Sequence, residues 1–228
     1  MREKAIYALL AAAALLLARN VYAIFLVLPD EAAQGAVYRI IFFHLPSWFT
    51  SFTAYLLAGV ASALYLRKRD GRYDSLAVAS TEIGTVFTAM GLVTGMIWAR
   101  PVWGIWWTWD PRLTWALITW LIYAGYLMLR KAIEDPSQRG KNSAVLNIFS
   151  FTAVVITYKA IDWWRTQHPG PVLSFRTGGG SIDPAMEQMI FANWLAVMLL
   201  AAALLLIRMR MEQNQREVDA LRRYVHAI

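Results

Sequence analysis

Six long apolar stretches dominate this 228-residue sequence and restrict it to one broad architecture. A bilayer core about 30 Å thick is crossed by about 20 helical residues, because a helix rises 1.5 Å per residue. The predicted spans are residues 5–28, 45–66, 76–99, 113–129, 144–161 and 185–207. We therefore expect an all-α integral membrane protein with six transmembrane helices.

The composition excludes the main alternatives. Hydrophobic residues make up 58% of the chain and charged residues 16%, whereas soluble domains carry roughly 25% charged residues. Disordered chains are poor in aromatic residues, but 14% of this chain is aromatic. The net charge of +7 does not indicate a nucleic-acid partner here, since basic residues of membrane proteins gather in cytoplasmic loops.

The first span has one alternative reading. Arg2 and Lys4 precede an Ala/Leu run, as in a secretory signal peptide. The apolar character continues to Leu28, which is too long for the core of a signal peptide, so we predict a membrane anchor.

The basic residues predict the orientation. With the N-terminus inside, 15 Lys and Arg fall in the inner segments and six in the outer segments, which are Arg39, Arg100, Arg112, Lys159, Arg165 and Arg176. Both termini are therefore expected in the cytoplasm. We predict a membrane domain over residues 1–207, with an outer surface that includes the Trp-rich segment 98–115, and a basic cytoplasmic tail over 208–228.

Six of the eleven Trp residues fall within segment 98–115, on the predicted outer face. Trp commonly anchors helices at the membrane interface, and this explanation stays open for the segment. The spacing of Trp103, Trp106 and Trp107 nevertheless predicts one face of a short interfacial helix. Such a face would present a flat aromatic surface to a large, planar, apolar ligand.

Two of the three His residues, His44 and His168, are predicted on that same face. A single interfacial His is usually a boundary residue, but two beside an aromatic surface indicate a ligand pair, and neutral imidazole is a common axial ligand of haem iron. His226 lies in the predicted tail. Four outer Arg residues could meet haem propionates or lipid phosphates, namely Arg100, Arg112, Arg165 and Arg176.

Two local motifs predict helix starts. Asp110-Pro111 and Asp183-Pro184 each have the pattern of an N-cap followed by the first helical residue, and Asp110 could also fix the Trp segment by hydrogen bonds.

Three glycines of the third span, Gly84, Gly91 and Gly95, predict close helix packing. Arg19 and Glu82 are charged residues within spans, where Glu82 could simply extend toward the inner surface.

The chain has no Cys, so it has neither disulfides nor thiolate metal ligands, and it cannot attach haem through thioethers.

The segment Trp103-Gly-Ile-Trp-Trp-Thr-Trp-Asp-Pro-Arg-Leu-Thr114 resembles the WWD signature of the haem-handling membrane proteins of cytochrome c biogenesis. Within them the chain is most similar to the haem exporter protein C (CcmC) family, also through His44 before Pro46, Thr94-Gly95 before the Trp segment, His168 after Trp163-Trp164, and residues 181–186.

The resemblance implies non-covalent haem b on the outer side, with His44 and His168 as axial ligands. It implies that the haem edge is held by the motif residues Trp103, Trp106, Trp107, Trp109 and Asp110, beside Arg112. The implied recipient of the haem is the haem chaperone CcmE. The other implied partners are the small subunit CcmD and the ABC transporter subunits CcmA and CcmB, besides membrane lipid. Whether chaperone loading includes a lyase-like, enzymatic step stays open.

Two other functional classes remain as alternatives. A six-span redox cytochrome would usually place its ligand His within the spans, and this chain offers no second pair. A solute transporter is less well supported, because no internal repeat or pair of broken helices is visible, and a structural scaffold would bind no chromophore.

Overall fold

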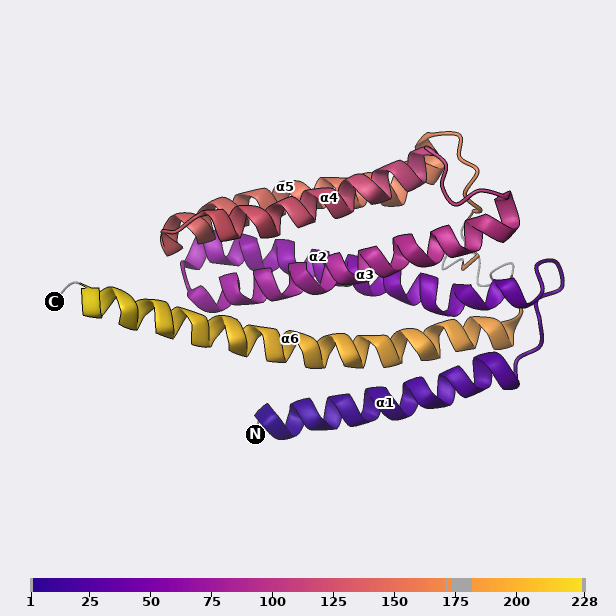
Figure 1. Ribbon diagram of the computed structural model, residues 1–228, viewed down its shortest axis with the longest axis horizontal. Coiled ribbons are helices and arrows are strands. Elements are labelled where there is room, and N and C mark those ends of the chain that lie inside the picture. The colour runs from indigo at the N-terminus through magenta and orange to yellow at the C-terminus, as the bar shows by residue number, and fades with distance from the viewer. Residues whose placement is uncertain (1, 171, 174–181, 227–228) are drawn as a thin grey trace.

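The computed structural model describes residues 2–170, 172–173 and 182–226, and every long element in these ranges is a helix (Figure 1). The elements are α1 (Arg2–Leu26), the short 3-10 helix η1 (Ala36–Ile40), α2 (Ile41–Lys68), α3 (Gly71–Trp103), α4 (Pro111–Ala132), α5 (Pro136–Trp163) and α6 (Pro184–His226). Six of them are long and apolar enough to cross a membrane, which confirms the predicted fold class.

The helices run up and down, so the connections gather at two ends (Figure 1). The described parts of the α1–α2, α3–α4 and α5–α6 connections lie at one end, which we call the histidine end. The start of α1, the end of α6 and the two tight turns lie at the opposite end, with α1 packed against α6 at one edge and α4 against α5 at the other. Segments far apart in sequence, around His44, Asp110 and His168, therefore share the histidine end.

The packing of α2 on α3 depends on the three glycines of α3, as predicted. A Cβ atom on Gly84 would come within 2.6 Å of the Tyr55 ring, and one on Gly91 within 2.7 Å of Trp48. Farther toward the histidine end, a Cβ on Gly95 would lie 3.2 Å from Cε1 of His44. Each glycine thus makes room for one large side chain of α2, including His44.

Near the histidine end, a proline leaves one backbone carbonyl of α2 without its helical hydrogen bond, and a side chain of α6 supplies the donor. Pro46 has no N–H, so the carbonyl of Phe42, four residues earlier, lacks its helical donor. Asn193 of α6 donates from Nδ2 to this carbonyl at 2.6 Å. Asn20 of α1 donates in turn to Asn193 Oδ1 at 3.4 Å and accepts from the exposed Arg19. The contact therefore joins α1, α6 and α2 beside His44.

At the opposite end, ion pairs join α3, α4 and α6. Asp74 accepts two hydrogen bonds from Arg130, at 2.7 and 3.0 Å, and both side chains are buried. Arg216 also pairs with Asp74, and Arg208 donates to Glu82 at 2.7 Å. Glu82, which the sequence allowed to extend toward the inner surface, is therefore also paired, because α6 continues past residue 207 and brings Arg208 against it.

The glycine contacts predict a selective loss of stability. Gly84→Ala places a methyl group inside contact distance of the Tyr55 ring, and overpacking of this kind costs about 1–3 kcal/mol. Gly125→Ala is the matched control on α4, since a Cβ there meets no atom within 4 Å. Unfolding of the purified protein in mixed micelles should show Gly84→Ala destabilised and Gly125→Ala not. Equal stability of the two variants would contradict this account of the α2–α3 contact.

Candidate functional site

The Trp-rich segment at the histidine end does not form the short helix that its spacing predicts. Helix α3 runs to Trp103 and ends there because Gly104 takes a left-handed conformation, with φ at +79°. Helix α4 begins at Pro111, so residues 104–110 form a non-helical connection between two antiparallel helices. The predicted helical face of Trp103, Trp106 and Trp107 is therefore wrong, because the chain must reverse direction within these few residues.

The Trp rings instead form two perpendicular pairs. Trp98 and Trp103 meet edge to face at 5.1 Å between centroids, and Trp98 Nε1 donates to Gln34 at 2.8 Å. Trp107 and Trp109 meet in the same way at 5.9 Å. Trp106 and Trp109 remain 54% and 76% exposed. The segment thus offers exposed aromatic edges and faces, not one flat surface.

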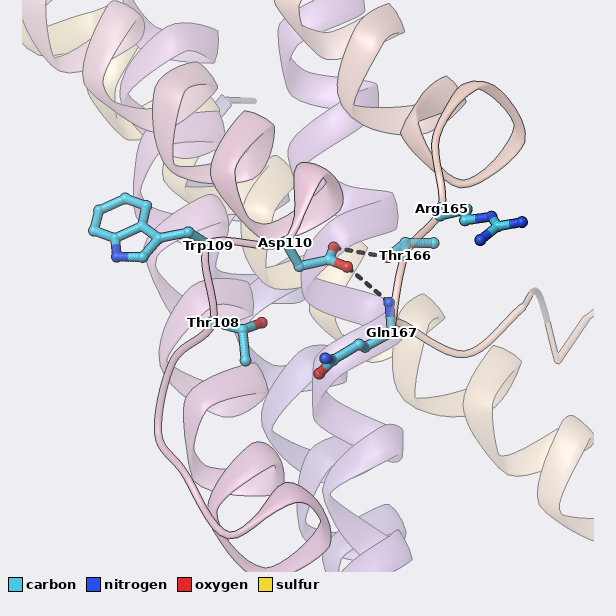
Figure 2. Close-up of a pocket in the computed structure, with 6 residues that line it drawn as sticks. All are labelled: Thr108, Trp109, Asp110, Arg165, Thr166 and Gln167. Carbon is cyan, nitrogen blue, oxygen red and sulfur yellow. Dashed lines mark hydrogen bonds between the residues drawn. The ribbon is translucent and has the colours of Figure 1, made fainter.

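Asp110 caps α4 as predicted and also holds the loop that carries His168 (Figure 2). Its Oδ1 accepts from the backbone N–H of Arg112 at 2.9 Å and from the Thr166 hydroxyl at 2.7 Å. Its Oδ2 accepts from the backbone N–H of Gln167 at 2.7 Å. Asp110 was expected to fix the Trp residues by hydrogen bonds, but it bonds loop 164–170. The donors of this loop and of α4 satisfy the buried carboxylate.

The hydrogen bonds of Asp110 to loop 164–170 also position His168. The Thr166 hydroxyl donates to Asp110, so its oxygen is available to accept from the backbone N–H of His168, at 3.0 Å. The His168 ring places Nδ1 2.8 Å from the carbonyl oxygen of Pro169. A carbonyl can only accept, so Nδ1 carries the proton and Nε2 keeps its lone pair. Burial and the positive charge of Arg112 both lower the pKa of His168 from 6.5, which favours the neutral, ligating form.

His44 is held in the same tautomer by a different element. Its Nδ1 lies 3.0 Å from the hydroxyl of Thr94 on α3. That hydroxyl donates its proton to the carbonyl of Met90 at 2.7 Å, so it accepts from His44 Nδ1–H. Gly95 and an edge-to-face contact with Trp48, 6.2 Å between centroids, fix the ring plane. Nε2 of His44 is therefore also left with a free lone pair.

The two imidazoles and Arg112 lie close enough to influence one another. The positive charge of Arg112 acts on both rings. Arg112 donates from Nη1 to two carbonyls of the last turns of α5, those of Thr157 at 2.7 Å and Tyr158 at 3.0 Å. It thereby fixes α4 to α5 beside the histidines, a role that its sequence position did not reveal.

The other outer Arg residues are dispersed. Arg100 bonds to the carbonyl of Gly104, and Arg39 pairs with Asp30 at 2.8 Å. Arg165 borders an open hollow of about 460 Å³ beside Asp110, and Figure 2 shows its guanidinium directed away from the carboxylate. Neither His44 nor His168 lines this hollow. Arg176 lies outside the described residues, as does Ser181 of the quoted motif.

Three polar atoms of the Trp-rich segment, one of them the Thr114 hydroxyl at the start of α4, lack partners among the described residues. Nε1 of Trp107 and the hydroxyl of Thr108 are buried without a hydrogen bond there. Buried donors of this kind are rare in native structures and often mark the place of a ligand or water. No group of three or more His, Asp and Glu side chains gathers as a metal site in the part of the chain that the structure describes.

Sequence reasoning missed Thr94, Thr166 and Gln167 as supports of the histidines. The position of Thr166 two residues before His168 is a pattern in which a hydroxyl often bonds a nearby backbone N–H, so that contact had a local signal. The contact of Thr94 with His44 joins residues 50 positions apart, for which one sequence gives no signal.

Comparison with known proteins assigns this chain to a family. Residues 1–224 match the family described as "Heme exporter protein C". Proteins of that name similar to this chain include one from Bradyrhizobium diazoefficiens, 37% identical over 213 residues, which are 93% of this chain and 80% of the relative. A second comes from Escherichia coli (strain K12) and is 35% identical over 182 residues, which are 80% of this chain and 73% of the relative. A third comes from Haemophilus influenzae and is 32% identical over 200 residues, which are 88% of this chain and 80% of the relative.

The Asp110 contacts predict a local change in loop 164–170. In Asp110→Asn an amide nitrogen replaces one carboxylate oxygen, so one of the loop donors would face another donor. The lost charged hydrogen bond is worth about 1.5–3 kcal/mol, so the Gln167 amide should exchange with deuterium about tenfold faster or more. Asp135→Asn is the control, since Asp135 caps α5 at the opposite end. Unchanged exchange at residues 166–168 would exclude this role of Asp110.

Proposed function

Since this chain belongs to the haem exporter protein C family, which handles haem for cytochrome c maturation, we propose that it holds haem between His44 and His168. In this proposal the haem is b-type and non-covalent, because the chain has no Cys for thioether bonds. The haem is cargo, and the protein binds it on the periplasmic side of a bacterial inner membrane. The excess of basic residues at the opposite end supports that orientation.

One observation carries the proposal, namely the shared tautomer of the two histidines. Each Nδ1–H is occupied by an oxygen acceptor, Thr94 for His44 and Pro169 for His168, so each Nε2 can bind iron. An oxygen acceptor on the ring nitrogen that does not bind the metal is a regular feature of metal-ligating histidines.

The surroundings fit a porphyrin. Exposed Trp106 and Trp109 can cover apolar edges, and the unsatisfied Nε1 of Trp107 can donate to a ligand. Arg112 supplies positive charge beside the histidines for the haem carboxylates, although Nη1 is engaged by α5. In this view Trp103 and Asp110 act by packing and by positioning, since Asp110 holds the loop of His168.

Two axial imidazoles favour holding haem over oxygen chemistry, because they leave no open position on the iron. Delivery then requires that one His leaves the iron. We place the recipient, the haem chaperone CcmE, at the histidine end, where the His168 loop and exposed Trp residues are accessible. Assembly with CcmD and with the transporter subunits CcmA and CcmB is part of the same proposal.

Removal of either ligand should abolish stable haem binding. For His44→Ala and His168→Ala, the Soret absorbance of the purified protein should fall to the level without haem, and CcmE loading should fail. His226→Ala is the control, since residue 226 ends α6 at the opposite end. Full Soret absorbance and normal loading in either ligand variant would refute the proposed site.

The acceptor of His44 should matter less than the ligand but measurably. Thr94→Val keeps the shape of the side chain and removes the oxygen that binds His44, so haem affinity should fall about 10- to 100-fold, as when the hydrogen-bond partner of a ligating histidine is lost. Thr94→Ser keeps the hydroxyl and should bind haem nearly as the unmodified protein does. If haem titration gives equal affinities for the Val and Ser variants, the hydroxyl has no role in ligation.

A further inference from the structure

One charged side chain of α1 points outward within the membrane span of that helix. Arg19 is exposed, whereas the next residue, Asn20, is fully buried in the bundle. No other charged residue occurs between Lys4 and Asp30. Arg19 lies 15 residues after Lys4 and seven before the end of α1 at Leu26, which are about 22 Å and about 10 Å along the helix. The guanidinium is therefore placed in the hydrocarbon and not at its edge.

No acidic side chain in the described part of the chain neutralises this charge. Nη1 of Arg19 donates to Oδ1 of Asn20 at 3.2 Å, and no described carboxylate pairs with it. A guanidinium has five N–H donors, so most of them remain available. Charged residues within spans usually face the bundle interior and pair there, because an isolated charge in hydrocarbon is costly. Arg19 faces away from the bundle, so its counter-charge must come from outside the chain.

Hydrogen bonds to two other helices hold Arg19 at this depth. Asn20 donates to Asn193 of α6 at 3.4 Å, and Asn193 donates to the Phe42 carbonyl of α2 at 2.6 Å. Helical side chains lean toward the N-terminus of their helix. For Arg19 this direction leads away from the nearer surface, at the histidine end, and toward the surface about 22 Å away. A lipid phosphate at either surface is therefore a poor counter-charge.

The face of α1 beside Arg19 has the pattern of a helix-pairing surface. Its exposed residues follow alternating spacings of three and four, which is the period of two helices that pack along their length. They are Ala8, Ala11, Leu15, Ala18 and Tyr22. Alanines at such positions let the backbones of two membrane helices approach closely. Because α1 lies at the edge of the bundle, a further helix can reach this face (Figure 1).

We propose that this face binds a transmembrane helix of another protein, and that an Asp or Glu side chain within that helix pairs with Arg19. Charge complementarity selects this occupant. A carboxylate accepts two parallel N–H bonds from a guanidinium, whereas a lipid acyl chain accepts none. The partner helix thus supplies the counter-charge that the described residues of this chain do not.

A second copy of this chain fits the face less well. Copies in one membrane are parallel, so two α1 helices packed through this face would place two Arg19 side chains at the same depth. The α1 of the second copy has no carboxylate between Glu3 and Asp30. On its α3, Glu82 already pairs with Arg208.

A photoreactive residue on this face tests the contact in native membranes. We replace Tyr22, which is 61% exposed, by p-benzoylphenylalanine, and we use Leu121 of α4, 52% exposed at the opposite edge, as the matched control position. Residue 22 should cross-link one membrane protein. That product should fall at least tenfold in Arg19→Gln and be retained in Arg19→Lys, which keeps the charge. A product composed of two copies of this chain, or no protein product above that of residue 121, would overturn the proposal.

Reversal of the charges tests the ion pair once mass spectrometry has identified the cross-linked protein. That protein should carry an Asp or Glu within a span. Arg19→Glu should abolish the product, and replacement of the partner's acid by Lys should restore it. The proposal fails if the spans of the partner contain no acid, or if the reversed pair gives no product although both proteins insert at normal levels.

A defined peptide tests the recognition chemistry without the natural partner. The probe is a 24-residue Leu/Ala helix with Lys at both ends and one central Glu, and its control has Leu in place of Glu. The chain has no Cys, so Ala32→Cys at the exposed connection after α1 carries a single fluorophore for energy transfer in phosphatidylcholine vesicles. The Glu peptide should bind about tenfold more tightly than the Leu peptide, and Arg19→Gln should remove the difference. Equal binding of the two peptides to the unmodified chain would contradict the proposed pairing.

This inference and the proposed haem site can fail separately. His44→Ala should lose the Soret band and keep the cross-link at residue 22. Arg19→Gln should lose the cross-link and keep the Soret band, since Arg19 does not contact the histidines.

Discussion

Hydrocarbon offers no hydrogen-bond partner to the backbone, and this constraint organises the whole molecule. Peptide groups within the bilayer must be paired inside helices, so irregular segments are confined to the two ends of the bundle. Because the chain passes up and down, residues 27–40, 104–110 and the described part of 164–183 meet at the same end. Polar chemistry that needs loops is therefore concentrated there without any sheet or separate domain.

Where the helices depart from this rule, another helix compensates. Pro46 leaves the Phe42 carbonyl without a donor, and Asn193 supplies one. The buried carboxylate of Asp74 is matched by Arg130, and removal of one partner of such a pair typically costs about 3–5 kcal/mol. Asn193 thus holds α6 to the bundle beside His44, and Arg216 of α6 holds it at the opposite end by pairing with Asp74.

Asp110 shows how a structural residue can become part of a functional site. Capping of α4 uses one carboxylate oxygen, and the remaining hydrogen-bonding capacity binds Thr166 and Gln167. The position of His168 thus depends on a helix N-cap in a distant segment. This link gives the acidic residue of the Trp-rich motif a physical role that does not require contact with a ligand.

Much of this could be predicted from the sequence. Apolar length predicted the six helices, Asp110-Pro111 and Asp183-Pro184 predicted two helix starts, and the alternation of spans placed His44 and His168 at one end. These properties depend on local composition and on whether an odd or an even number of spans separates two segments. Both can be read from a single sequence.

Other features depend on which residues meet across the bundle. The spacing of Trp103, Trp106 and Trp107 predicted a helix, but the reversal between α3 and α4 excludes it. The pairing of Glu82 with Arg208, the tie from Asp110 to Thr166, and the acceptor that fixes the His44 tautomer all join positions at least 50 apart. The sequence by itself determined the number of crossings and the end at which the histidines lie. Only the tertiary structure decided their tautomers and supports. A hydrogen bond forms only when two atoms lie close together, and residues adjacent in the sequence do not determine the distance between atoms that are far apart in the chain.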